Sequence, residues 1–197
     1  NSSIKDFSKL KKELNKKQIE IIEFGKKNIF FKKDKNIIKL NLNKKIYNLT
    51  NLKLRTTIEL ENLECAIACC LALGIKEKKI VNILSKINNP PGRLEKINFE
   101  KKNSKIIIDY AHTPDALKKI LKSFKINKKK PVLLFGCGGE RDKDKRSKMG
   151  IIAKNLSSKT YITDDNPRNE NAAKIRKDII KYCPNGIEIA GRKKAIF

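Results

Sequence analysis

The sequence predicts an α/β protein of two domains, the second of which has a mostly parallel sheet. Short alternating apolar runs separated by turn residues fill the first quarter of the chain, and apolar positions at helical spacing follow from residue 58. Strand-like and helix-like runs then alternate to the end, which is typical of a parallel sheet. Asn-Asn-Pro-Pro-Gly at residues 88–92 is the strongest break in the chain, so we predict domains at residues 1–91 and 92–197.

The first predicted domain combines a small sheet with core helices. Residues 8–17 are expected to form a short basic helix. Four short strands of a mostly antiparallel sheet are predicted at residues 19–24, 28–32, 36–42 and 45–49. Helical spacing predicts a helix over residues 58–74, ended by Gly74, and a second helix over residues 76–87. The positions expected to face the core in the longer helix are Leu60, Leu63, Ala66, Ile67, Cys70, Leu71 and Leu73.

The second predicted domain begins with a strand after Arg93, a turn at residues 101–104 and a strand at residues 105–110. Thr113 is the expected N-cap of a helix that has Pro114 at its first position and reaches about residue 124. The remaining predicted elements are a strand at 132–135, a helix from about 145, a strand at 160–163, a helix at 171–181, a strand at 187–189 and a further helix start at 192.

Two polar loops of this domain carry the candidate chemistry. One, at residues 136–142, reads Gly-Cys-Gly-Gly-Glu-Arg-Asp, and the other, at residues 164–168, reads Asp-Asp-Asn-Pro-Arg. A crossover of this length makes the preceding strands parallel, so both loops open at the edge of the sheet where such folds bind ligands. The guanidinium groups of Arg141 and Arg168 suit a carboxylate or phosphate, and Asp165 and Asn166 offer acceptors for an amine. The pattern predicts a zwitterionic, amino-acid-like ligand in one crevice.

Composition raises one rival function. Lys and Arg number 47 against 21 Asp and Glu, for a net charge of +26, which invites a nucleic-acid-binding reading. The lysines are spread through every segment beside Asn and Ile, residues that A/T-rich codons favour, so compositional drift explains the charge without a partner. Aromatic residues make up 6% and Trp is absent, which leaves no obvious platform for stacked bases. We therefore expect no nucleic-acid partner.

The cysteines and apolar runs bear on the compartment. Five cysteines without metal-ligand spacing predict reduced, mostly buried thiols in the cytoplasm, with neither a disulfide framework nor a metal site. We expect no signal peptide, because the first residues lack an apolar stretch, and no membrane insertion, because no apolar run reaches membrane-spanning length. The chain begins without Met and stops in a predicted helix, so we expect a fragment of something longer.

Four motifs in order resemble those of the Mur ligases. They are Gly-Arg-Leu-Glu at 92–95, Asp-Tyr-Ala-His-Thr-Pro at 109–114, and the two polar loops at 136–142 and 164–168. The resemblance implies the end of a central ATP-binding domain followed by most of a Rossmann-like C-terminal ligase domain, truncated at both ends. The P-loop of that family lies outside this chain, so the fragment is not expected to be active alone.

The resemblance implies an ATP- and Mg²⁺-dependent ligase that forms an amide bond through an acyl phosphate. Within the family, the motifs are most similar to those of ligases that add meso-diaminopimelate to UDP-N-acetylmuramoyl-L-alanyl-D-glutamate in peptidoglycan synthesis. These two substrates are the implied partners, and the full-length enzyme is expected to be a cytoplasmic monomer. The alternatives are a lysine-adding ligase of the same family, a folylpolyglutamate synthetase, and more remotely the basic nucleic-acid-binding module.

The resemblance also implies roles for single residues around ATP. Arg93 matches a hinge arginine that reaches the nucleotide and stabilises phosphate charge, and Asp109 matches the acidic residue that binds the ribose hydroxyls. His112 matches a motif histidine that is either a general base or a positioning group. Asn62 matches the asparagine that contacts adenine, whereas Glu59 stands three residues earlier, where the family often has another asparagine.

Four residues match the set that binds diaminopimelate. They are Arg141, Asp165, Asn166 and Arg168. Diaminopimelate ends in a second amine and a second carboxylate, so Arg168 is expected to pair with the distal carboxylate and Asp165 with the distal ammonium. Lysine-adding relatives commonly lack the arginine that ends the Asp-Asn-Pro-Arg motif, and Arg168 therefore favours diaminopimelate.

Overall fold

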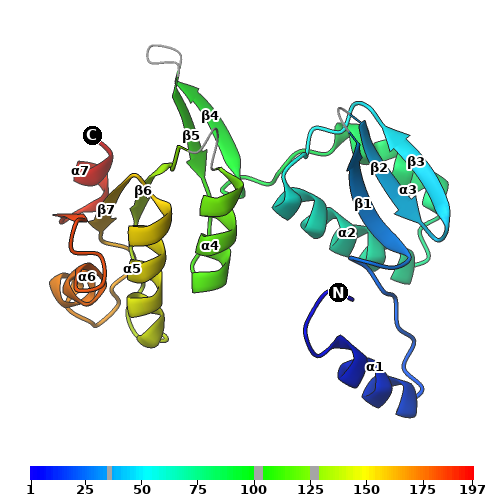
Figure 1. Cartoon of the computed structure of the whole chain (residues 1–197), viewed down its shortest axis with the longest axis horizontal. Helices are drawn as coiled ribbons and strands as arrows, with labels where there is room; N and C mark the ends of the chain where they lie inside the picture. The colour runs from blue at the N-terminus through cyan, green and yellow to red at the C-terminus, as the bar shows by residue number, and fades with distance from the viewer. Residues whose placement is uncertain (35–36, 100–103, 125–128) are drawn as a thin grey trace. The chain divides into compact units, whose positions relative to one another are not determined.

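The chain folds into two compact units, Asn1–Asp109 and Tyr110–Phe197 (Figure 1). The computed structural model describes residues 1–34, 37–99, 104–124 and 129–197. The units part after Asp109, whereas the boundary expected from the sequence lies at residue 91; the hairpin that follows the Pro-Pro-Gly turn accounts for the difference. The boundary at residue 91 stays a prediction.

The sheet of the first unit is an antiparallel meander. Its strands are β1 (Ile29–Asp34), β2 (Ile37–Leu42) and β3 (Lys45–Leu49), in the order β1-β2-β3. They follow the helix α1 (Phe7–Lys16). These four elements confirm the sequence prediction, but the strand expected at residues 19–24 is wrong. Only Phe24 forms a bridge, to Ile29 across the turn at Gly25, and none of the described strands pairs with residues 19–23.

Two helices complete the core of the first unit. Helix α2 (Thr57–Ala72) confirms the predicted helix, and Gly74, with φ of +76°, follows its end as expected. The helix starts with a capping box that the sequence analysis did not predict. The second predicted helix divides into α3 (Glu77–Ile83) and the 3₁₀ turn η1 (Leu84–Lys86). The side chains of α2 that are buried in this core belong to Leu60, Leu63, Ile67 and Ala68, and the partly buried Cys70 and Leu71 pack against it.

The prediction that Ala66 and Leu73 face the core is wrong. Ala66 is exposed, and Leu73, which follows the last residue of α2, is 80% exposed, because both positions are rotated around the helix axis away from the stripe that packs on the sheet. The prediction of mostly buried thiols is wrong for Cys65 and Cys69, which are exposed, whereas Cys137 and Cys183 are buried and Cys70 is half-buried. All five cysteines are free in the structure.

A two-stranded antiparallel hairpin ends the first unit. It consists of β4 (Glu95–Phe99) and β5 (Ser104–Ile108), with Ile97 opposite Ile106. Residues 101–103 of the predicted turn lie outside the described residues. The strand predicted at residues 105–110 is confirmed with different bounds: β5 ends at Ile108, and Asp109 follows it directly.

The second unit contains the predicted parallel sheet. Its strands β6 (Val132–Phe135), β7 (Lys159–Thr163) and β8 (Ile187–Ile189) run parallel in the order β6-β7-β8. The helices are α4 (Pro114–Ser123), α5 (Asp144–Leu156), α6 (Ala172–Ile180) and α7 (Arg192–Ile196). Thr113 caps α4 by accepting from the amide of Ala116, which confirms the predicted helix start. The core contains Phe135, Met149, Ala153, Ile162 and Ile179.

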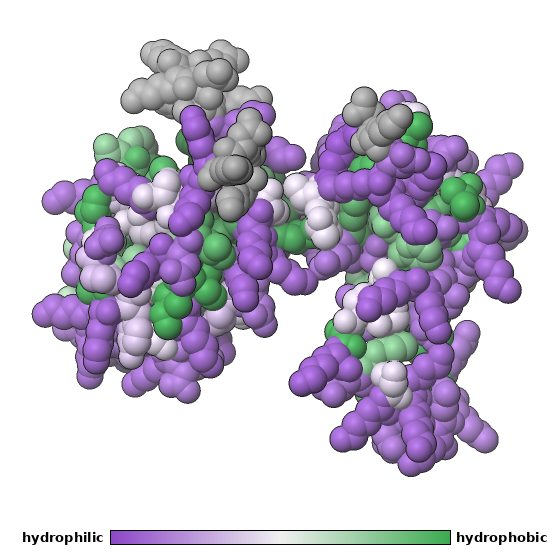
Figure 2. All heavy atoms as spheres, viewed as in Figure 1, coloured by the Kyte–Doolittle hydropathy of each residue, from purple (hydrophilic) through white to green (hydrophobic). Residues whose placement is uncertain are grey.

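Hydrophilic side chains are distributed over the visible face of both units (Figure 2). Lysines belong to each described sheet, through residues such as Lys39, Lys96 and Lys159, and also to helices of both units. Within the described part of the chain, no helix has the length and apolar character needed to cross a membrane.

Candidate functional site

The two predicted loops meet at one edge of the parallel sheet. We call residues 136–142, which follow β6, the glycine loop, and residues 164–168, which follow β7, the arginine loop. The amide of Gly139 donates to the carbonyl oxygen of Asn166 at 2.9 Å, and Nη1 of Arg168 donates to the carbonyl oxygen of Gly139 at 2.6 Å. The predicted topology is confirmed, and the two loops are directly hydrogen-bonded.

The glycines are required because the loops pack backbone against backbone. A Cβ atom at Gly136 would lie 2.3 Å from the carbonyl oxygen of Thr163, and one at Gly139 would lie 1.9 Å from that of Pro167. At Gly138 the nearest atom would be Nη1 of Arg168, at 3.1 Å. The absence of a side chain at Gly136 and Gly139 thus makes room for the backbone of the neighbouring loop.

Arg168 is held in a defined orientation at this edge. Its φ of +50° is in the left-handed region, and its amide donates to Oδ1 of Asn166 at 3.2 Å in an Asx turn. A guanidinium has five N–H donors in one plane, so the bond to Gly139 fixes that plane while the residue stays exposed. Arg141 is exposed on the glycine loop.

Of the two aspartates in the arginine loop, Asp164 has a structural role. Its carboxylate accepts from the guanidinium of Arg176 and, at 2.6 Å, from the amide of Gly191. Burial acts to raise the pKa of Asp164, but these donors outweigh it, and the pKa lies below its usual range. Asp165 is 46% exposed, with Oδ1 3.9 Å from Nη2 of Arg192. Asp165 is therefore the carboxylate of this loop that a ligand can reach.

The space beneath the two loops is closed. The hollow there is lined by Cys137, Thr163, Pro167, Arg176 and their neighbours, and it leaves no room for a water molecule. Burial raises the pKa of the Cys137 thiol to about 11, so this thiol is protonated at neutral pH. This hollow therefore has no room for a ligand, and the candidate residues Arg141, Asp165, Asn166 and Arg168 are exposed on the outer side, or rim, of the two loops. A ligand crevice at this edge stays a prediction.

The sequence did not reveal the ion pairs that hold this edge together. Arg146 of α5 is 2% exposed and pairs with Glu170, which precedes α6, and with Asp178, which belongs to α6. Oε1 of Glu170 also accepts from the amide of Glu140 in the glycine loop, at 2.5 Å. A run of Lys, Asp and Arg at the start of α5 gives no signal of which cation is buried, so Arg146 was missed.

The residues matched to ATP belong to the first unit, apart from His112. Oδ2 of Asp109 accepts from the amide of Leu94 at 2.9 Å, which ties the end of β5 to the residue after Arg93. Leu94 has φ of +48°, and Arg93 is exposed. The chain thus brings the backbone next to Arg93 and the carboxylate of Asp109 together, while Asn62 is exposed on α2.

Glu59, which stands where the resemblance implies an asparagine, is part of the α2 cap. Its side chain is 2% exposed and accepts from the amides of Arg55 and Thr56 at 2.9 and 2.7 Å and from Nδ2 of Asn89 at 2.6 Å. Burial acts to raise the pKa of Glu59, but the donors from Thr56, Arg55 and Asn89 outweigh it and lower the pKa. This carboxylate is committed to the fold.

His112 is exposed in the second unit, beside the start of α4. Its Nδ1 lies 3.1 Å from the carbonyl oxygen of Tyr110, and the two rings meet edge to face with centroids 5.3 Å apart. Nζ of Lys145 donates to the carbonyl oxygen of His112 at 3.2 Å. If Nδ1 carries the proton in the bond to Tyr110, Nε2 is the basic nitrogen.

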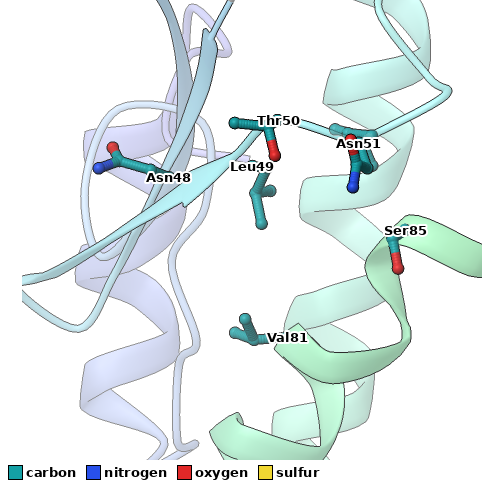
Figure 3. Close-up of a pocket in the computed structure, with 7 residues that line it drawn as sticks. Asn48, Leu49, Thr50, Asn51, Val81 and Ser85 are labelled. Atoms are coloured by element: carbon teal, nitrogen blue, oxygen red, sulfur yellow. The ribbon is translucent and has the colours of Figure 1, made fainter.

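A further hollow lies in the first unit, away from every predicted site residue. Its volume is ≈ 180 Å³, and its walls are formed by the end of β3 and by α3 and η1 (Figure 3). Amide and hydroxyl groups of Asn48, Asn51 and Ser85 line it without a charged side chain. No cluster of three or more His, Cys, Asp or Glu side chains suited to a metal occurs among the described residues.

Comparison with known proteins gives consistent matches. The family model described as "Mur ligase, glutamate ligase domain" matches residues 92–197. UDP-N-acetylmuramoyl-L-alanyl-D-glutamate--2,6-diaminopimelate ligase of Anaplasma marginale (strain St. Maries) is 44% identical over 140 residues, which are 70% of this chain and 28% of the relative. The protein of the same name from Rickettsia felis is 36% identical over 211 residues, covering 100% of this chain and 38% of the relative.

A solved structure gives a matching result. The structure of a UDP-N-acetylmuramoyl-L-alanyl-D-glutamate--2,6-diaminopimelate ligase resembles this chain with a TM-score of 0.51 and 26% identity, covering 98% of this chain and 42% of that one. The chain thus spans well under half the length of the proteins that it matches.

Proposed function

This chain belongs to the Mur ligase family, and from that premise we propose that it is part of an ATP-dependent ligase that adds meso-diaminopimelate to UDP-N-acetylmuramoyl-L-alanyl-D-glutamate. The observation that carries the proposal is that one loop presents both the exposed Arg168, oriented by Gly139, and the accessible carboxylate of Asp165. The names of the two relatives agree with it.

The proposed amino-acid site uses opposite charges on one rim. The distal carboxylate of diaminopimelate pairs with the guanidinium of Arg168, and the distal ammonium pairs with Asp165, while Asn166 and Arg141 supply further polar contacts. Asp165 now lies 3.9 Å from Nη2 of Arg192, and an incoming ammonium would compete with that guanidinium. Charge-assisted, bidentate pairs of this kind give both affinity and geometric selectivity.

The proposed reaction activates a carboxylate and then forms an amide. The γ-phosphoryl group of ATP passes to the D-glutamate carboxylate, and the amine nitrogen of diaminopimelate attacks the resulting acyl phosphate, whose phosphate leaves. Arg93 would stabilise the negative charge of the phosphates during these two steps, and Asp109 would accept hydrogen bonds from the ribose hydroxyls. With one oxygen of Asp109 bonded to Leu94, the carboxylate is held in place. Asn62 is assigned to adenine, and His112 to proton transfer or positioning.

Residues of this chain can be assigned to ATP, but none can be assigned to Mg²⁺. A guanidinium suits phosphate oxygens, and a carboxylate suits ribose hydroxyls. Mg²⁺ takes oxygen ligands, often from phosphates and water with one or two carboxylates, and the described residues offer no carboxylate cluster for it. We therefore assign no residue of this chain to Mg²⁺. The cytoplasmic location and monomeric state stay predictions.

The test is amino-acid-dependent release of ADP by the full-length ligase, with meso-diaminopimelate or L-lysine as the acceptor. Wild type should turn over with diaminopimelate, and Arg168→Ala should lower kcat/KM for it by about 10- to 150-fold, as expected for a lost charged hydrogen bond of about 1.5–3 kcal/mol. Lys177→Ala, which removes an exposed cation of α6, is the matched control and should change nothing. Turnover with L-lysine, or an unchanged kcat/KM in Arg168→Ala, would refute the proposed diaminopimelate site. Only the assignment to the Mur ligase family would then remain.

A further inference from the structure

Glu170 lies at the centre of a set of contacts that joins three elements of the second unit. Its carboxylate accepts from the amide of Glu140 at 2.5 Å and, through both oxygens, from Nη2 of Arg146 at 3.0 and 2.9 Å. Glu140 belongs to the glycine loop and Arg146 to α5. Glu170 therefore connects the segment after the arginine loop both to the glycine loop and to a buried cation.

The residue that Glu170 holds is in a demanding conformation. Glu140 has a backbone φ of +50°, in the left-handed region that residues other than glycine rarely adopt. Its neighbours in sequence are Gly139, whose carbonyl oxygen orients Arg168, and Arg141, the other candidate ligand for a carboxylate. Because the peptide bond is rigid, the position of the Glu140 amide also fixes the Gly139 carbonyl.

We propose that Glu170, supported by Arg146, is a positioning residue for the incoming amino acid. Through the Glu140 amide it sets the backbone of the glycine loop, and through that backbone it sets the guanidinium groups of Arg168 and Arg141. Glu170 itself does not touch the ligand. This inference rests on the proposed function, because the ligand whose binding it governs is the one assigned there.

Asp178, the other carboxylate partner of Arg146, provides a matched comparison for the role of Glu170. Arg146 donates with Nη2 to Glu170 and with Nη1 to Oδ2 of Asp178, at 2.9 Å. Asp178 shares the buried cation but lies on α6, and the contacts described for it reach Arg146 and not the glycine loop. Removing either carboxylate weakens the pairing of Arg146, whereas only removal of Glu170 frees the Glu140 amide.

The experiment compares Glu170→Ala with Asp178→Ala in the full-length ligase. A displacement of about 1 Å in a binding group costs up to about a hundredfold in rate, so Glu170→Ala should raise the KM for diaminopimelate at least about tenfold while leaving the KM for ATP within about twofold. Glu170→Gln should recover part of the loss, because its amide oxygen can still accept from Glu140. Asp178→Ala should keep both KM values within about twofold of wild type.

Hydrogen exchange gives a second readout that does not depend on turnover. The amide of Glu140 should exchange faster in Glu170→Ala than in wild type, and at the wild-type rate in Asp178→Ala. An equal rise in KM for both alanine variants, or an unchanged KM and exchange rate in Glu170→Ala, would overturn the positioning role. Failure of wild type to use diaminopimelate would instead overturn the proposed function, and the exchange rates would still decide whether Glu170 holds the loop.

Discussion

Replacement of Gly139 by alanine should separate the two loops of the candidate site. A Cβ atom there would lie 1.9 Å from the carbonyl oxygen of Pro167, whereas ordinary contacts begin at 3.4 Å, so the loops would have to part by about 1.5 Å. The obstacle is backbone, which cannot swing aside as a side chain can. That movement breaks the bond from the Gly139 amide to Asn166 and the bond from Arg168 to the Gly139 carbonyl. Losing a neutral and a charged hydrogen bond costs about 2–4 kcal/mol.

The assay for Gly139→Ala is kcat/KM for diaminopimelate, measured with the unfolding temperature of the full-length ligase. We expect a fall of about a hundredfold in kcat/KM, because the shift exceeds the roughly 1 Å that costs a factor of about 10², together with a lower unfolding temperature. Gly74→Ala is the control: its φ is +76°, but nothing lies within 4 Å of its Cβ, so it adds backbone strain without a clash. Gly74→Ala should retain kcat/KM. A Gly139→Ala enzyme with kcat/KM within about threefold of wild type would refute the claim that loop contact orients Arg168.

Three further outcomes are expected. Thr56→Ala should destabilise the first unit by about 0.5–2 kcal/mol, measured by urea unfolding, because it removes half of the α2 capping box; no change would mean that the cap is dispensable. In the native protein, iodoacetamide should label the exposed thiols of Cys65 and Cys69 well before the buried, protonated Cys137, as read by mass spectrometry, and equal rates would contradict that burial. The amide of Glu140 and the guanidinium of Arg146 lower the pKa of Glu170, so its carboxylate stabilises the fold above its unfolded pKa of about 4.3 and loses this effect as pH falls through the lower folded value. The difference in unfolding temperature between wild type and Glu170→Gln should therefore shrink from pH 6 to pH 3, and a constant difference would refute the pairing.

Local signals in the sequence were sufficient for most elements. Hydrophobic periodicity predicted β1 to β3, and the pair of Thr113 and Pro114 predicted the start of α4, because such signals lie within a few residues of the element that they define. The segment at residues 19–24 has the alternation of a strand, but only Phe24 pairs. Pairing depends on a partner strand, and alternation within the segment carries no information about that partner.

The candidate site shows the same division between local and distant information. The parallel crossover predicted that the glycine loop and the arginine loop share an edge, since topology follows from the order of elements. The closure of the two loops, by contrast, depends on contacts such as Gly139 with Pro167 across the edge. Likewise, Arg146 is buried by Glu170 and Asp178, which follow it by 24 and 32 positions, and no pattern around Arg146 predicts them.

The position of meso-diaminopimelate in a crystal structure of its complex with the full-length ligase tests the central claim most directly. We predict that the distal carboxylate lies within hydrogen-bond distance of the Arg168 guanidinium and that the distal ammonium contacts Asp165. In the same complex, Nη1 of Arg168 should remain bonded to the Gly139 carbonyl. Diaminopimelate bound away from the rim of the two loops, or bound there with its distal carboxylate on another cation, would contradict the account.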